Sequence, residues 1–291
     1  MNVLCKLEDF YLNFNGEKGI IGKSVKGRNI YYFKVEKTKK PILIVQYAIH
    51  AREYITTFLA LRQIEDFIKR GKKGTIYFIP AVNPDGIVIS QTENPLYKAN
   101  QNGVDLNVNF DACWGRGEKN VLRSGAENYI GEFPFSEPET VALRDFTLKI
   151  KPDLTLSYHS KGEEIYWQFH QTGKKAKRDF NIAKHLAKET GYNIKSTPNS
   201  TGGYKDWCIS SLNIPAFTIE VGSDELSHPI GEENIEQIYK KNKNVLNVLT
   251  ESTSGRIRKI YGASLKGSEK SQTERRSSYR RCNSYKRKGH S

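Results

Sequence analysis

Hydrophobic positions between residues 29 and 250 alternate between short, almost unbroken runs and longer stretches with helical spacing. The run at 41–49 (PILIVQYAI) is typical of a strand that is covered on both faces. The segment 54–70 instead repeats its apolar residues at helical intervals. A second buried strand is predicted at 75–81 (TIYFIPA). We therefore expect strands and helices to alternate along this region.

The rest of this region continues the alternation. The residues at 83–86 (NPDG) predict a turn that ends the second strand. Ser136 and Glu139 have the spacing of a capping box, which predicts that a helix begins there. Further elements are expected as strands at 154–158 and 215–221 and as helices at about 175–191 and 233–250. Together these patterns predict an α/β fold, a single domain with a mixed, mostly parallel central sheet flanked by helices.

The apolar pattern stops after Ser252, which divides the chain into a domain at 1–253 and a tail at 254–291. The tail holds twelve of the 46 Lys and Arg residues but only two of the 32 Asp and Glu residues. Because it has few aliphatic side chains, we expect it to be disordered. Most of the net charge of +14 therefore belongs to the tail. That charge is no argument for a specific nucleic-acid partner of the domain.

Length and composition exclude several classes of protein. A chain of 291 residues with 37% hydrophobic residues has room for a substantial core. No stretch approaches the ~20 apolar residues of a membrane span, and Lys6, Glu8 and Asp9 interrupt the opening segment, unlike a secretory signal. We therefore expect a cytoplasmic protein. The sequence does not indicate the oligomeric state.

Three polar residues at predicted strand ends suggest a metal site. His50 follows the strand at 41–49, and Glu53 comes three residues later, so that both side chains can converge on one point. His159 ends the strand at 154–158 in the same way. A catalytic zinc ion usually takes three protein ligands and keeps one position for water. By themselves, however, His50 and Glu53 fit a half-buried histidine beside a helix-capping glutamate better than a metal site.

Eight segments, in order, give the chain a clear resemblance to the zinc metallocarboxypeptidases of the carboxypeptidase A type. The resemblance covers about residues 20–250. The matching segments are IGKSVKGR (21–28), HARE (50–53), NPDG (83–86), GVDLNVNF (103–110), SEPET (136–140), YHS (158–160), GGYKDW (202–207) and FTIEV (217–221).

The resemblance implies roles for individual residues. His50, Glu53 and His159 would bind one Zn²⁺ ion, Glu220 would be the general base, and Asp105 would orient His50. Zinc lowers the pKa of bound water and polarises a carbonyl group, while a carboxylate at a buried strand end can carry the proton to the leaving amine. A solvent-facing glutamate and a simple turn aspartate are the alternatives for Glu220 and Asp105.

Two basic residues, Lys98 and Arg52, each allow two interpretations. Lys98 falls where the family places an arginine that stabilises the oxyanion, although a lysine lacks the forked donor geometry. Alternatively, Lys98 is a solvated loop residue. Arg52 stands between two expected ligands and is a candidate for substrate binding. Alternatively, it only pairs with a neighbouring carboxylate.

The chain departs from the family where the free carboxylate of a peptide is held. The family motif DLNRNF reads DLNVNF here, so that Asn107 remains but Val108 replaces the arginine. Losing a bidentate guanidinium should weaken carboxylate binding. The family tyrosine that closes over substrate is also expected to be absent, with Pro198 at its position by simple offset. Lys205 stands at the floor of the side-chain pocket, where it would favour an acidic substrate unless it reaches solvent.

A substrate with an acidic side-chain end that need not be a free C-terminus fits meso-diaminopimelate in peptidoglycan stem peptides. GGYKDW also resembles the bacterial γ-D-glutamyl-diaminopimelate endopeptidase branch of the family. We therefore expect a zinc peptidase that cleaves the γ-D-glutamyl–meso-diaminopimelate amide of a peptide or muropeptide. One alternative is a carboxypeptidase for acidic C-terminal residues, with Arg116 or Arg123 as the carboxylate clamp. The others are a binding module that uses the basic tail and a catalytically inactive relative.

Overall fold

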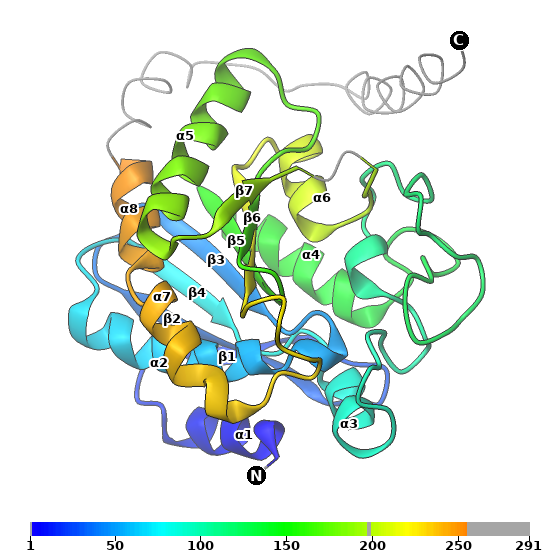
Figure 1. Cartoon of the computed structure of the whole chain (residues 1–291). Coiled ribbons are helices and arrows are strands. Elements are labelled where there is room, and N and C mark those ends of the chain that lie inside the picture. The colour runs from blue at the N-terminus through cyan, green and yellow to red at the C-terminus, as the bar shows by residue number, and fades with distance from the viewer. Residues whose placement is uncertain (1, 197–198, 255–291) are drawn as a thin grey trace.

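The computed structural model describes residues 2–196 and 199–254, and its described strands form one sheet (Figure 1). The sheet order is β1-β2-β4-β3-β5-β8-β6-β7. Except for Ser254, the expected disordered tail lies outside the described residues, as does Pro198. The strands are β1 (Lys18–Lys23), β2 (Asn29–Glu36), β3 (Ile42–Tyr47), β4 (Thr75–Ile79), β5 (Leu154–Ser160), β6 (Glu164–Tyr166), β7 (Asn193–Lys195) and β8 (Ala216–Val221).

The four central strands, β4, β3, β5 and β8, run parallel to one another. The edge pairs β1–β2 and β2–β4 and the pair β8–β6 are antiparallel, whereas β6–β7 is parallel. These pairings confirm the predicted mixed sheet. Since the central strands are parallel, the carboxyl ends of β3, β5 and β8 lie along one edge of the sheet.

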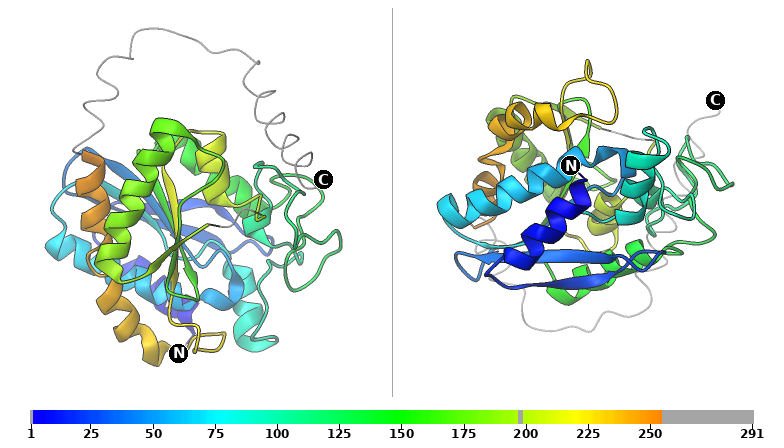
Figure 2. Two further views of the ribbon diagram at one scale, coloured as in Figure 1. Left: turned by 45° about the horizontal axis from the view of Figure 1, so that its top comes forward. Right: turned by 90° about the horizontal axis from the view of Figure 1, so that it is seen from below.

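Helices cover both faces of the sheet, giving three layers (Figure 2). One face packs against α1, α2, α5, α7 and α8, and the other packs against α4 and α6. None of the described helices is long and apolar enough to cross a bilayer. The helices are α1 (Val3–Asn13), α2 (Ile55–Arg70), α3 (Pro84–Thr92), α4 (Pro138–Ile150), α5 (Gly173–Thr190), α6 (Tyr204–Ser210), α7 (Ile235–Asn242) and α8 (Val245–Ser254), with 3-10 turns η1 (Ala51–Glu53), η2 (Leu106–Val108) and η3 (Glu232–Asn234).

Three local predictions were wrong. The NPDG segment is the start of α3, because the Asn83 side chain accepts a hydrogen bond from the Gly86 amide and caps a helix. Ser136 and Glu139 form no capping box, since α4 begins at Pro138 and the Ser136 hydroxyl donates to Glu137 instead. The helix expected at 233–250 is divided into η3, α7 and α8.

Candidate active site

Three candidate metal ligands meet at the carboxyl ends of neighbouring parallel strands. His50 lies just beyond β3, and His159 is the penultimate residue of β5, which pairs with β3. Glu53 ends the short turn η1, which connects β3 to α2. All three side chains are buried, and one ligand atom from each lies within 4.8 Å of the other two. The structure thus brings together the three residues that the sequence proposes as ligands.

Both imidazoles turn the same ring nitrogen towards the Glu53 carboxylate. His50 Nδ1 lies 2.8 Å from Oε1, and His159 Nδ1 lies 2.9 Å from Oε2. The two Nδ1 atoms are 3.1 Å apart. Two nitrogens and a carboxylate around one point are a donor set that zinc accepts.

Asp105 decides which nitrogen of His50 can bind a cation. Its Oδ1 lies 3.2 Å from His50 Nε2, and this nearby carboxylate favours the tautomer that carries the ring proton on Nε2. The Nδ1 lone pair then faces the carboxylate of Glu53 and the Nδ1 of His159. These electron-rich atoms repel one another unless a proton or a metal cation lies between them. The arrangement therefore fits a bound metal ion.

The charges of the cluster support this interpretation. Burial works against ionisation of the Glu53 carboxyl, but the His50 and His159 imidazoles outweigh it and hold the pKa of Glu53 below its ordinary value. Burial likewise disfavours the charged form of His50, but Glu53 and Asp105 outweigh it and raise the pKa of His50. The cluster therefore attracts positive charge to its centre.

Glu220 lies beside the candidate ligands. It is in β8, directly opposite His159 in the register between β5 and β8. Burial raises the pKa of the Glu220 carboxyl above its ordinary value, although the nearby His159 opposes the rise. A carboxyl with a raised pKa is a better proton acceptor than an ordinary one, as a general base must be.

Lys98 is not a solvated loop lysine. Its Nζ lies 2.7 Å from Asp105 Oδ2, and its side chain is 16% exposed. Burial alone would lower the pKa of Lys98, but the Asp105 carboxylate outweighs it and raises that pKa. In turn, Lys98 and His50 overcome the effect of burial and lower the pKa of Asp105. A charged ammonium is thus held beside the ligand cluster, while its role at the oxyanion stays a prediction.

Arg52 and Asn107, two other residues predicted to bind substrate, both contact other parts of the protein. Arg52 donates from Nη1 to the Leu96 carbonyl oxygen, and the same nitrogen lies 3.4 Å from Glu127 Oε2. Pairing with a carboxylate was the alternative expected for Arg52. The Asn107 Oδ1 accepts a hydrogen bond from the Tyr204 backbone amide at 3.2 Å. Their substrate-binding roles stay predictions.

Lys205 has a partner that the sequence interpretation did not include. It is the second residue of α6 and is buried, and its Nζ forms an ion pair with Asp206. The Nζ also donates to the Gln168 carbonyl oxygen at 3.0 Å and lies 5.7 Å from the centre of the Phe169 ring. Lys205 therefore does not reach solvent. A substrate carboxylate would therefore have to compete with Asp206 for the Lys205 ammonium.

The two arginines considered as an alternative carboxylate clamp both lie on the surface, and their role stays a prediction. Arg116 is exposed and lines a separate cavity, and Arg123 is exposed. Gly202 lies against Val108 instead, with φ +85°, and a Cβ atom there would lie 2.7 Å from the Val108 carbonyl oxygen. The site keeps Asn107 without the guanidinium that would hold a terminal carboxylate.

His228 is a further candidate that sequence reasoning missed. Its Nδ1 is buried and has no hydrogen-bond partner within the described chain. Burial lowers the pKa of His228, and the charges of Glu53 and Arg52 act on it, so its ring lies near the ligand cluster. A single histidine in an irregular segment carries no sequence signal for such a position.

Comparisons with known proteins agree with this geometry. The profile of the family described as zinc carboxypeptidase matches residues 16–245. The chain is 30% identical over 277 residues to gamma-D-glutamyl-L-diamino acid endopeptidase 1 of Lysinibacillus sphaericus, covering 83% of this chain and 68% of that protein. It is 31% identical over 221 residues to murein peptide amidase A of Escherichia coli (strain K12), covering 71% of this chain and 83% of that protein.

A solved structure is similar in fold as well. Carboxypeptidase A from Helicoverpa armigera matches with a TM-score of 0.76 over 88% of this chain and 72% of that one. The sequence identity is 20%, so this likeness supports the architecture and not the substrate.

Proposed function

The chain belongs to the zinc carboxypeptidase family, and we propose that it hydrolyses the γ-D-glutamyl–meso-diaminopimelate amide of peptidoglycan stem peptides. It is a metallopeptidase of this family, and homologues act on peptidoglycan peptides. The observation that carries the finer assignment is Val108 beside Asn107, where a carboxypeptidase needs an arginine. Without that arginine, capture of a free C-terminal carboxylate is weak. The similarity to a γ-D-glutamyl-L-diamino acid endopeptidase supports the same choice.

The proposed cofactor is one zinc ion held by His50 Nδ1, His159 Nδ1 and the Glu53 carboxylate. When bound, zinc would polarise the scissile carbonyl and lower the pKa of water. Asp105 keeps the ring proton of His50 on Nε2, so that Nδ1 is free to bind.

The remaining steps belong to the residues around the metal. Glu220 takes a proton from the attacking water as the new carbon–oxygen bond forms. It then hands that proton to the amine of meso-diaminopimelate as the carbon–nitrogen bond breaks. Lys98, fixed by Asp105, supplies positive charge where the carbonyl oxygen becomes negative. Asn107 positions the leaving residue through its amide.

The substrate assignment is tested with two peptides. The purified protein is incubated with L-Ala-γ-D-Glu-meso-diaminopimelate and, separately, with a hippuryl-type carboxypeptidase substrate, and the products are identified by mass spectrometry. We expect release of meso-diaminopimelate from the first peptide. Turnover of the hippuryl substrate alone would reject the endopeptidase assignment and favour a carboxypeptidase.

The catalytic assignment is tested with Glu220→Gln. This variant keeps the three metal ligands but cannot accept a proton, so it should retain one zinc ion per chain and lose at least about 100-fold in kcat. Metal content is measured by atomic emission and kcat by product release. A variant that retains the wild-type kcat contradicts the role of Glu220, while a wild-type protein that binds no zinc contradicts the whole site.

A further inference from the structure

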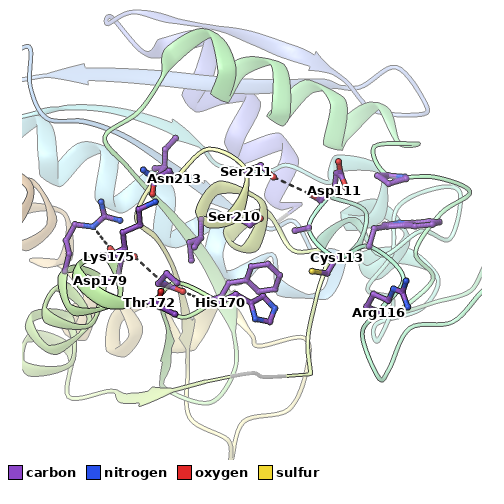
Figure 3. A pocket seen from close by; sticks show the side chains of 18 of the residues that line it. Asp111, Cys113, Arg116, His170, Thr172, Lys175, Asp179, Ser210, Ser211 and Asn213 are labelled. Carbon is purple, nitrogen blue, oxygen red and sulfur yellow. Dashed lines mark hydrogen bonds and ion pairs between the residues drawn. The ribbon is translucent and has the colours of Figure 1, made fainter. Parts of the chain in front are cut away.

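A cavity lies beside the carboxyl end of α6 and is lined by none of the candidate metal ligands (Figure 3). Its volume is about 720 Å³, within the size range of small-molecule and peptide sites. It is bounded by the segment at 111–116, the segment leading into α5, and the residues that follow α6. Glu220 does not line it either.

The cavity carries an excess of positive charge, because four cationic side chains and only two carboxylates, those of Asp111 and Asp179, line it. Arg116, Lys174 and Lys175 line it, and no ion pair joins any of them to another residue in the part of the chain that the structure describes. Figure 3 shows Arg116 and Lys175 on opposite sides of the cavity. Arg178 also lines it but is paired with Asp179 at 2.6 Å. Cations that face a cavity from two sides favour an anionic ligand.

Apolar walls lie between these cations. Phe169 is 6% exposed, and Ile209 and Ile214 contribute aliphatic surface. The Trp114 ring is fixed because its Nε1 donates to the Ile130 carbonyl oxygen at 2.9 Å. The cavity is therefore suited to a molecule that combines an anionic group with an apolar body, rather than to a free inorganic ion.

The cavity is close to the end of the active site where the leaving residue is expected. Phe169 lines the cavity, and the centre of its ring lies 5.7 Å from Lys205 Nζ. Lys205 is near the start of α6, and Ile209 and Ser210 at its end line the cavity. A seven-residue helix spans about 10 Å, which is the reach of about three extended peptide residues.

From this geometry we propose that the cavity binds the carboxylate end of the peptide that continues beyond meso-diaminopimelate. This inference rests on the proposed function and deepens it. The positive charge missing at Val108 is supplied further along the leaving segment, by Arg116, Lys174 and Lys175. The enzyme should then prefer stem peptides that extend past meso-diaminopimelate over the tripeptide that ends there.

The test compares two substrates and two variants. The substrates are L-Ala-γ-D-Glu-meso-diaminopimelate and the same peptide extended by D-Ala-D-Ala at its carboxyl end. The double variant Arg116→Gln/Lys175→Gln removes cations from both sides of the cavity. Lys177→Gln is the matched control, because Lys177 is an exposed residue of the same helix that does not line the cavity.

We expect the double variant to raise KM for the extended peptide by roughly threefold to tenfold, the range for two partly exposed ion pairs. KM for the tripeptide and kcat for both peptides should stay at the wild-type value, as should all constants of Lys177→Gln. Thermal unfolding checks that the variants fold. Lys175→Glu is a second test. Because it reverses the charge, this variant should raise KM for the extended peptide more than the double variant does, and it should leave KM for the tripeptide unchanged.

The possible failures are distinguishable. If the wild-type chain cleaves both peptides and the double variant keeps the wild-type ratio of KM values, only the cavity inference is overturned. An equal rise in KM for both peptides also overturns it, because the tripeptide has no segment to fill the cavity. If the wild-type chain cleaves neither peptide, the proposed function fails and this inference fails with it.

Discussion

At the scale of single residues, Asp105 connects two parts of the site. One carboxylate oxygen fixes the ring proton of His50, and the other holds the Lys98 ammonium. The backbone amide of Asn107 also donates to this carboxylate at 3.0 Å. A single buried side chain thus sets the orientation of a metal ligand, a cation and the segment that carries Asn107.

Replacing Asp105 by Asn should therefore weaken zinc binding. Partners that orient a ligating histidine typically contribute 10-fold to 100-fold in metal affinity. We expect a loss in this range for Asp105→Asn, measured by competition with a chromophoric chelator. Asp111→Asn, an exposed aspartate in the same segment, should bind zinc like the wild type. Equal affinities for the two variants would contradict the orienting role of Asp105.

The sequence did not predict which charged side chains pair with one another. His50 and His159 could be placed at predicted strand ends, and the resemblance to the family identified them, together with Glu53, as ligands. The contact between Lys98 and Asp105 depends on how two irregular segments fold against each other. No periodic pattern encodes that contact. Lys205 shows the same limit, since its burial against Gln168 and Phe169 depends on a distant segment.

At the scale of elements, the continuous apolar runs predicted the central strands well. The runs at 41–49, 75–81 and 215–221 became β3, β4 and β8, because strands covered on both faces need apolar residues at nearly every position. The edge strand β1 and its neighbour β2 were not predicted. Their burial pattern is mixed, so their sequences lack a continuous run.

Gly202, which lies just before α6, determines how closely this segment approaches the turn η2. Its φ of +85° favours glycine, and a Cβ atom would lie 2.7 Å from the Val108 carbonyl oxygen. Gly202→Ala should therefore lower the free energy of unfolding by about 2–4 kcal/mol, from backbone strain and from displacement of Val108.

Gly27 is the matched control for this change. It has a similar φ of +79°, but no atom lies within 4 Å of a Cβ placed there. Gly27→Ala should cost only about 1 kcal/mol, from strain alone. Both values are measured by urea denaturation. Equal losses for the two variants would show that the close approach to Val108 contributes nothing.

At the scale of the whole molecule, a buried carboxyl joins segments that are far apart in the chain. Glu139, at the start of α4, accepts the Val25 amide at 3.2 Å and the Asn100 side-chain amide at 3.1 Å. Burial raises the pKa of Glu139 to about 7. The folded protein therefore holds the Glu139 proton more tightly than the unfolded chain does.

The stability of the molecule should depend on pH through this group. Because the pKa of Glu139 is higher in the folded state, its contribution is complete below about pH 4.5 and is lost as the pH rises through about 7. The free energy of unfolding of wild type minus that of Glu139→Gln should fall by as much as about 3 kcal/mol between pH 4.5 and 8. Urea denaturation at a series of pH values measures this difference.

An exposed glutamate gives the control for that series. Glu132→Gln, seven residues earlier, should leave the difference from wild type nearly constant over the same pH range. A flat difference for Glu139→Gln as well would mean that the Glu139 carboxyl titrates alike in the folded and unfolded chains.

The parallel arrangement of β3, β5 and β8 separates the residues proposed for hydrolysis from the residues proposed for substrate choice. His159 and Glu220 lie on strands in the middle of the sheet, and His50 and Glu53 follow β3 directly, so that a change there would disturb the core. The side chains that would choose a substrate, such as Val108 and Arg116, lie in irregular segments between those strands. New specificities can therefore arise by remodelling the connections while the hydrolytic machinery is inherited unaltered.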